Sequence, residues 1–311
     1  MNLLACAVLL LGACDRSASS TSGTPFNGET ARQYVKTQLD FGARVPGTEA
    51  ARKTGDWIVA EMRQRADTVI EQKWTHVTAK GDTLPLRNIF ARFNPKATTR
   101  IFYVTHWDSR PVSDQAEDPA KRSLPVPGAN DGASGVGLFI ALGDVLKKTP
   151  PTVGVDLLFV DGEDYGTFGP PDVDVLLGST YFAANLPAGY QPIFGVLFDM
   201  IGDADLEIPE EQNSLERAPE VVSRVWDTAA KLGYQKYFPP RAGYAVTDDH
   251  IPLLDKGLRV IDVIDLDYLG PPGSGKPNYH HTPDDTLDKV SAQSLKIVGD
   301  VAYALITGAQ E

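Results

Sequence analysis

Residues 100–106 read Arg-Ile-Phe-Tyr-Val-Thr-His, a nearly continuous apolar run that ends on a histidine. Such a run is typical of a β-strand buried on both faces, because neither face then carries solvated side chains. A helical pattern follows at Gly132–Lys147, opened by Asn130-Asp131, and another apolar run follows at Val153–Val160. Strand and helix patterns thus alternate through the middle of the chain. This alternation predicts an α/β fold with helices on both faces of a central sheet.

The alternation continues on both sides of this segment. Further strands are predicted at Thr68–Val77, Arg87–Phe93, Ile193–Phe198 and Arg259–Ile264, and further helices at Glu29–Gly42, Thr48–Ala66, Ser179–Asn185, Pro219–Leu232 and Ser291–Thr307. No repeat or linker interrupts residues 26–311. We therefore predict one domain at residues 29–311, with a twisted, mostly parallel or mixed sheet. The acidic stretch Asp203–Glu216 is interpreted as a surface loop without function.

The first residues have the composition of a targeting segment. A short apolar run ends in Leu-Gly-Ala-Cys at residues 11–14, and a Ser/Thr/Gly-rich stretch follows. The run is too short for a membrane span and resembles the signal of a bacterial lipoprotein, although it lacks a positive start. We predict a signal peptide at residues 1–13, lipidation of Cys14 and a flexible linker at residues 14–28. The protein would then lie outside the cytoplasm, anchored to a membrane only through Cys14. The alternative is a chance apolar start.

Charge excludes one class of partner. The 311-residue chain has a net charge of -12, and 42% of its residues are hydrophobic. Nucleic-acid binding requires clustered Lys and Arg against the phosphates, so an acidic chain of this kind argues against it. The acidic balance does not identify a substrate.

Several residues with metal-binding side chains lie at or just after the ends of apolar runs. His106 ends one predicted strand, Glu163-Asp164 follows another, and Asp199 follows a third. In open α/β sheets, ligands bind outside the carboxyl ends of the strands. Asp131 stands at a predicted helix start, and His281 lies in the stretch His-His-Thr-Pro-Asp-Asp at residues 280–285. This mixture of imidazole and carboxylate is suited to zinc.

Each candidate also has a purely structural interpretation. Asp131 alone could be a helix N-cap, Asp199 could cap or pair at a strand end, and His106 could be a buried, hydrogen-bonded histidine. The Glu163-Asp164 pair alone could be a solvated turn. All of these interpretations would have to hold at once, which favours a metal site. Of two adjacent acids, one can bind a metal while the other moves protons, but the sequence alone does not order the two.

A family resemblance becomes clear on these motifs. His106-Trp107-Asp108, Asn130-Asp131, Gly162-Glu163-Asp164, residues 198–202 (Phe-Asp-Met-Ile-Gly) and His281-Thr282 resemble the zinc aminopeptidase superfamily. Within it, residues 248–254, Asp-Asp-His-Ile-Pro-Leu-Leu, are similar to the animal-type glutaminyl-peptide cyclotransferases, or glutaminyl cyclases. The resemblance covers about residues 29–307, and it implies a zinc aminopeptidase-like fold.

The resemblance also implies roles for individual residues. One zinc ion would be held by Asp131, Asp164 and His281, with Glu163 as general base and acid. Asp199 and Asp248 would hold the amine and amide of the substrate. His106 occupies the position that binds a second metal in the aminopeptidases or otherwise faces the pocket. The substrate pocket would be lined by His280, Tyr165 and Phe168.

Departures from the animal enzymes affect the pocket more than the metal site. Asp164 stands where those enzymes carry Glu, His280 stands where they carry an aromatic residue, and Asp262 replaces a His of the last strand. The Trp that follows their paired acids is absent.

These observations predict a glutaminyl-peptide cyclotransferase. It would convert the N-terminal Gln of peptides or proteins to pyroglutamate, releasing ammonia, as the substrate's own amine attacks an amide polarised by zinc. The alternative is an aminopeptidase with two zinc ions, in which Glu163 activates water. A third possibility is a lipoprotein that keeps this fold only as a binding surface. The oligomeric state stays open.

Overall fold

The computed structural model describes residues 24–266 and 278–309. Its centre is a six-stranded sheet with the order β1-β2-β4-β3-β5-β6. The strands are β1 (Thr68–Val77), β2 (Thr83–Phe93), β3 (Arg100–His106), β4 (Gly154–Val160), β5 (Phe194–Asp199) and β6 (Val260–Ile264). The strands β4, β3, β5 and β6 pair in parallel, whereas β1 and β2 join them antiparallel. The predicted mostly parallel, mixed sheet is confirmed.

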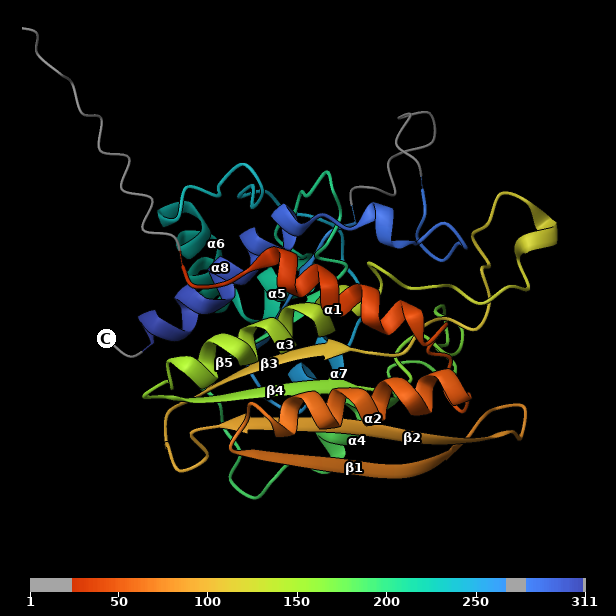
Figure 1. The fold of residues 1–311 in the computed structure, drawn as a ribbon, viewed down its shortest axis with the longest axis horizontal. Helices are drawn as coiled ribbons and strands as arrows, with labels where there is room; N and C mark the ends of the chain where they lie inside the picture. The colour runs from red at the N-terminus through yellow and green to blue at the C-terminus, as the bar shows by residue number, and fades with distance from the viewer. Residues whose placement is uncertain (1–23, 267–277, 310–311) are drawn as a thin grey trace, which may run out of the picture.

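The helices cover both faces of this sheet (Figure 1). They are α1 (Gly28–Asp40), α2 (Glu49–Arg63), α3 (Ala133–Lys148), α4 (Leu177–Ala184), α5 (Gln212–Arg217), α6 (Pro219–Lys231), α7 (His250–Asp255) and α8 (Ala292–Gly308). One-turn 3₁₀ helices lie at Pro119–Lys121 and Leu287–Lys289. Figure 1 shows α2 running along β1 and β2, and α1 lying beside α3.

Two hydrophobic cores form because side chains alternate along β3. Ile101 and Tyr103 face the larger core, which includes residues of α1, α2, α3, α6 and α8. Phe102 and Val104 face the smaller core, to which α4 and α7 contribute. Every residue of β3, β4, β5 and β6 is buried. The apolar runs of the sequence are therefore strands covered on both sides.

Several features differ from the sequence predictions. The strand β2 begins four residues before the predicted Arg87, because Thr83–Leu86 pair with β1 despite the intervening Pro85. The stretch Asp203–Glu216 is not simply a surface loop: it contains most of α5, and Asp203 and Glu211 are buried. The short helix α7 was also missed, since six residues are too few for a helical period to appear.

The end of the predicted linker is packed rather than free. Phe26 is buried in the larger core, and its ring fills the space over Gly299 of α8. The Thr24 hydroxyl donates to Asp300 of the same helix. The predicted flexible linker at residues 14–28 therefore does not extend through residue 26. The predicted signal peptide and Cys14 lie outside the described residues.

Candidate metal centre and active site

The predicted site residues meet at the carboxyl end of the sheet. His106 is the last residue of β3 and pairs in parallel with Val160, the last residue of β4. His106 Nε2 lies 3.2 Å from Asp199 Oδ1 at the end of β5, and its Nδ1 lies 3.7 Å from Glu163 Oε2. All of these side chains are buried. Parallel pairing thus brings three strand ends together, as expected from the sequence.

The donor atoms form two groups that share Asp131. In the first group, His281 Nε2 lies 3.6 Å from Asp131 Oδ2 and 3.4 Å from Asp164 Oδ2. In the second, His106 Nε2 lies 3.0 Å from Asp131 Oδ1 and 3.2 Å from Asp199 Oδ1. Ligands of a tetrahedral zinc ion, each about 2.0–2.1 Å from the metal, lie about 3.3 Å from one another. The donor atoms of the second group all lie within 4.8 Å of one another, and in the first group the two distances from His281 are close to this ligand spacing.

The oxygen of Asp164 that faces this centre supports the assignment. Asp164 Oδ2 is buried and has no hydrogen-bond partner among the described residues, whereas its Oδ1 accepts from Arg110 Nη1 at 2.6 Å. A buried carboxylate oxygen left without a donor is costly unless a cation occupies the space beside it. Asp131, Asp164 and His281 therefore fit a metal ion. His280 stacks on His281 and forms a further possible donor group with it and Asp131.

Asp131 is directed into the site by its backbone. The two oxygens of the buried Asp285 carboxylate accept from the amides of Asn130 at 2.8 Å and Asp131 at 3.1 Å. Gly132 follows with a φ of 83°, and a Cβ there would lie 2.6 Å from the Asp108 carbonyl oxygen. Gly132, not Asp131, is the N-cap of α3, and it makes no side-chain capping bond. The simple capping interpretation of Asp131 is therefore wrong.

The Glu163-Asp164 turn is held by the carboxylate of Asp108, which belongs to a family motif but to which the sequence assigned no role. Asp108 Oδ1 accepts from the Glu163 amide at 3.1 Å, and its Oδ2 accepts from the Asp164 amide at 3.2 Å. Asp108 is fully buried. Together with Arg110, it fixes Asp164 with one free oxygen toward His281. Glu163 is left outside both donor groups, so the structure separates two acids that the sequence could not order.

The electrostatic environment of Glu163 favours its protonated form. Burial raises its pKa well above the usual value, and the neighbouring carboxylates of Asp164, Asp248 and Asp249 raise it further, while His106 opposes them. Burial also raises the pKa of Asp248, with a contribution from Asp199. Asp131 behaves differently: burial alone would raise its pKa, but His106 and His281 hold it well below the usual range. The site therefore combines a firmly anionic donor with a carboxyl able to take up a proton.

A cavity of about 500 Å³ opens over these residues. Asp131, Glu163, Asp199, Asp248 and His281 line it, and among the predicted pocket residues so do His280 and Phe168. Tyr165 is not among its lining residues; Tyr165 lies near Asp82 and Asp174, whose charges raise the pKa of its hydroxyl further after burial. Tyr244, which is 64% exposed, lies at the wall instead. Neither hydrophobic periodicity nor a sequence motif identifies Tyr244 as a cavity residue, because it reaches the cavity from a loop that is distant in the sequence.

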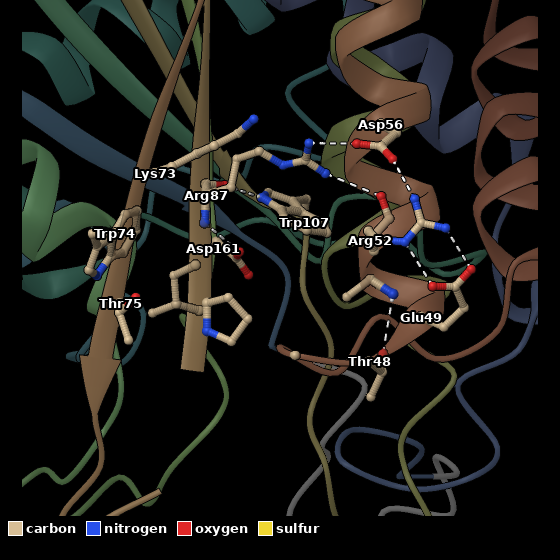
Figure 2. Close-up of a pocket in the computed structure, with 14 residues that line it drawn as sticks. Thr48, Glu49, Arg52, Asp56, Lys73, Trp74, Thr75, Arg87, Trp107 and Asp161 are labelled. Carbon is tan, nitrogen blue, oxygen red and sulfur yellow. Dashed lines mark hydrogen bonds and ion pairs between the residues drawn. The ribbon is translucent and has the colours of Figure 1, made fainter. Parts of the chain in front are cut away.

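A second cavity of about 620 Å³ lies between α2 and the β1–β2 hairpin (Figure 2). Trp107 and Asp161, which adjoin site residues in the sequence, line it. Arg87 bridges the walls: its Nη1 lies 2.8 Å from Asp56, and its carbonyl oxygen accepts from Trp107 Nε1 at 3.1 Å. The charged side chains at this cavity are thus largely paired with one another. The predicted catalytic residues Glu163, Asp199 and Asp248 line the first cavity instead.

Comparison with known proteins places the chain in a family. The model of peptidase family M28 matches residues 88–306, which include every residue of the two donor groups. The chain belongs to peptidase family M28. Its fold is that of the zinc exopeptidases, as the sequence predicted.

Solved structures of two kinds resemble this M28 protein. Porphyromonas gingivalis glutaminyl cyclase is 37% identical, with a TM-score of 0.86, and the match covers 91% of this chain and 98% of that one. A leucine aminopeptidase precursor from Bacteroides thetaiotaomicron is 34% identical, with a TM-score of 0.84, over 90% and 97% of the two chains. Both kinds of structure are therefore similar over nearly their whole length.

Curated relatives also include both activities. Aminopeptidase YwaD of Bacillus subtilis is 26% identical over 83% of this chain, and glutaminyl-peptide cyclotransferase of Bos taurus is 23% identical over 81%. The bovine relative bears out the resemblance to the animal-type cyclases. The chain spans 52% of YwaD and 75% of the bovine protein, but about half or less of several other curated relatives. Among the described residues, no helix is long and apolar enough to cross a membrane.

Proposed function

We propose that this M28 protein is a glutaminyl-peptide cyclotransferase acting on peptides or proteins with an N-terminal Gln. The observation that carries the proposal is Asp248, the first residue of the cyclase-like stretch 248–254. It is 3% exposed, lines the cavity with Glu163 and Asp199, and has an Oδ2 atom without a described partner. A buried acceptor at this position suits a substrate N–H group. The glutaminyl cyclases among the similar structures support the same activity.

The donor chemistry supports zinc as the metal of this site. Asp131, Asp164 and His281 would hold it, and zinc bound there would polarise the side-chain amide carbonyl of the substrate as a Lewis acid. Asp199 and Asp248 would bind N–H groups of the substrate and bring its α-amine toward its side-chain amide. Such alignment of two groups of one molecule can lower a barrier by about 7–11 kcal/mol.

Glu163 would carry the proton through the reaction. The α-amine nitrogen forms a bond to the side-chain carbonyl carbon, and the bond from that carbon to the amide nitrogen breaks. Glu163 accepts the proton that the amine loses and returns it to the departing nitrogen, which leaves as ammonia. The raised pKa of Glu163 makes it a stronger base than an ordinary carboxylate, which favours uptake of the amine proton.

A second candidate function is favoured by one specific feature. The group of His106, Asp131 and Asp199 has donor spacings suited to a second ion, and the chain is similar to a leucine aminopeptidase precursor. A protein with both groups occupied would be equipped for hydrolysis, with Glu163 activating a water molecule.

Two measurements separate these functions. The purified protein is incubated with a Gln-initiated peptide and with a Leu-initiated peptide of otherwise identical sequence. Loss of ammonia from the first without release of Leu from the second, at one zinc per chain, is the expected result. Release of Leu at a comparable rate, with two zinc ions per chain, would establish the aminopeptidase and overturn the proposal.

We further propose that the protein is lipidated at Cys14 and anchored to a bacterial membrane on its extracytoplasmic, periplasmic side. The Leu-Gly-Ala-Cys sequence at residues 11–14 supports this placement. The test is fatty-acid labelling of the full-length protein in a bacterial host. Labelling of the wild type but not of Cys14→Ala is expected, and equal labelling of both would refute the anchor.

A further inference from the structure

The carboxylate of Glu211 lies behind the cavity wall that carries Asp248. Its Oε1 accepts from the amides of Asn213 at 2.8 Å and Val246 at 2.9 Å. Its Oε2 accepts from the Ser214 amide at 2.6 Å and lies 3.3 Å from His250 Nε2. Glu211 is 2% exposed. Three backbone amides donate to this buried carboxylate, and His250 lies within ion-pair distance of it. Hydrogen bonds to an ionised group are strong, so the three amides make a rigid junction.

The junction holds the chain on both sides of Asp248. Val246 precedes Asp248 by two residues, and besides its amide its carbonyl oxygen is also held, by Asn213 Nδ2 at 2.8 Å. His250 follows Asp248 by two residues and contacts the other oxygen of Glu211. The Glu211 side chain therefore contacts this segment on both sides of Asp248, through a hydrogen bond at Val246 and a close approach at His250.

His250 links the junction to the last strand. It is fully buried, and its Nδ1 lies 3.9 Å from Asp262 Oδ2 of β6. The Asp262 amide in turn donates to the Ser214 hydroxyl of α5 at 2.9 Å. Both oxygens of Asp262 lack described hydrogen-bond partners, and burial and the nearby Asp248 raise its pKa. His250, the first residue of α7, thus lies between two buried acids.

We infer that Glu211 and His250 are positioning residues, which hold the carboxylate of Asp248 at the cavity wall in the orientation that the reaction needs. This inference rests on the proposed role of Asp248. Neither residue lines the cavity, so neither would contact substrate. Among the described residues, the hydrogen bonds and ion pair of the Glu211 side chain are with Asn213, Ser214, Val246 and His250. None of these is a predicted zinc ligand, so loss of the Glu211 carboxylate should leave the metal centre in place.

The test is a double-mutant cycle on the full-length protein. The variants are Glu211→Gln, Asp248→Asn and both together, with Glu210→Gln as the matched control, since Glu210 is the adjacent carboxylate and lies outside this junction. His250→Gln serves in the same cycle should Glu211→Gln not fold. Zinc content, melting temperature, kcat and KM are measured for each, at a temperature well below melting. Hydrogen exchange of residues 244–250 is followed in parallel.

The expected result is a fall in kcat of at least tenfold for Glu211→Gln, with KM changed less than threefold and zinc retained. In the Asp248→Asn background the same substitution should cause less than a twofold further loss, because its effect passes through Asp248. Amide exchange should accelerate at residues 244–250 in Glu211→Gln and not in Glu210→Gln. The inference is overturned if the two substitutions lower kcat by independent factors in the double variant. It is also overturned if amide exchange at residues 244–250 is unchanged in Glu211→Gln, or if the melting temperature of that variant falls while its kcat stays constant.

Failure of the proposed function gives a different result. If the wild type releases Leu and forms no pyroglutamate, the cyclase assignment fails, and the cycle is then measured with the Leu-initiated peptide. If the wild type acts on neither peptide, the exchange measurement still decides whether Glu211 holds the segment around Asp248, and normal exchange in Glu211→Gln refutes it.

Discussion

Replacing Asp108 with Asn tests whether this buried carboxylate holds the Glu163-Asp164 turn in place. The two side chains have nearly the same shape, so packing is preserved. Asp108 accepts one backbone hydrogen bond on each oxygen, from Glu163 at 3.1 Å and Asp164 at 3.2 Å. Asn keeps one acceptor oxygen and turns an NH₂ group toward the other amide. One buried N–H group is then left unsatisfied.

The size of the effect follows from these contacts. A hydrogen bond to a charged group contributes about 1.5–3 kcal/mol, and an unsatisfied buried donor costs about 1–3 kcal/mol. Since these two terms overlap, the free energy of unfolding should fall by about 2–4 kcal/mol. At roughly 2 °C per kcal/mol for a chain of this size, the melting temperature should drop by about 4–8 °C. Zinc affinity should fall about 10- to 100-fold, as for other residues that orient metal ligands.

Thermal unfolding and competition with a chelator of known zinc affinity measure the two effects. Asp118→Asn is the matched control, because Asp118 also accepts a backbone amide, from Ala120 at 2.9 Å, but is exposed. That control should change the stability by less than about 1 kcal/mol, since an exposed cap is resolvated by water. If Asp108→Asn binds zinc as tightly as the wild type and melts within about 1 °C of it, the reasoning on the turn is wrong.

Three further outcomes are expected. Glu163→Gln should lose at least about 100-fold in kcat while keeping wild-type zinc content, and near-normal turnover would remove Glu163 from the mechanism. His281→Ala should lose the catalytic zinc, whereas His106→Ala should retain one zinc per chain. Measuring the zinc content of both variants distinguishes the two donor groups. Loss of all zinc from His106→Ala would show that the two groups are not separate. Glu211 adds a pH dependence: burial alone would raise its pKa, but His250 and backbone amides lower it from 4.5 to about 2. Its contribution to stability is therefore present above about pH 4.5 and is lost as the pH falls toward about 2. Between pH 7 and pH 3 the wild type should accordingly lose about 2 kcal/mol more unfolding free energy than Glu211→Gln. Denaturant titration of both proteins at the two pH values measures this difference.

The sequence predicted much of the fold and a set of candidate metal donors. Strands that are buried on both faces appear as apolar runs, so β3 was predicted with its observed bounds at Arg100–His106. Because parallel strands end at one edge of a sheet, polar residues at those ends could be expected to meet, and His106 and Asp199 do. The family motifs then selected Asp131 and His281, which no local pattern distinguishes from a cap and a loop residue.

Only the tertiary structure showed how the surroundings of the two adjacent acids differ. Asp164 and Glu163 are adjacent in sequence, and they differ because Arg110, 54 positions before Asp164, engages one oxygen of Asp164. The junction at Glu211 was hidden for the same reason: its partners Val246 and His250 lie 35 or more positions along the chain, and an acidic stretch shows nothing of its burial. The periodicity of a sequence indicates which face of a helix or strand is apolar. It does not indicate which distant side chain pairs with a buried charged group, and such pairs set the geometry of this site.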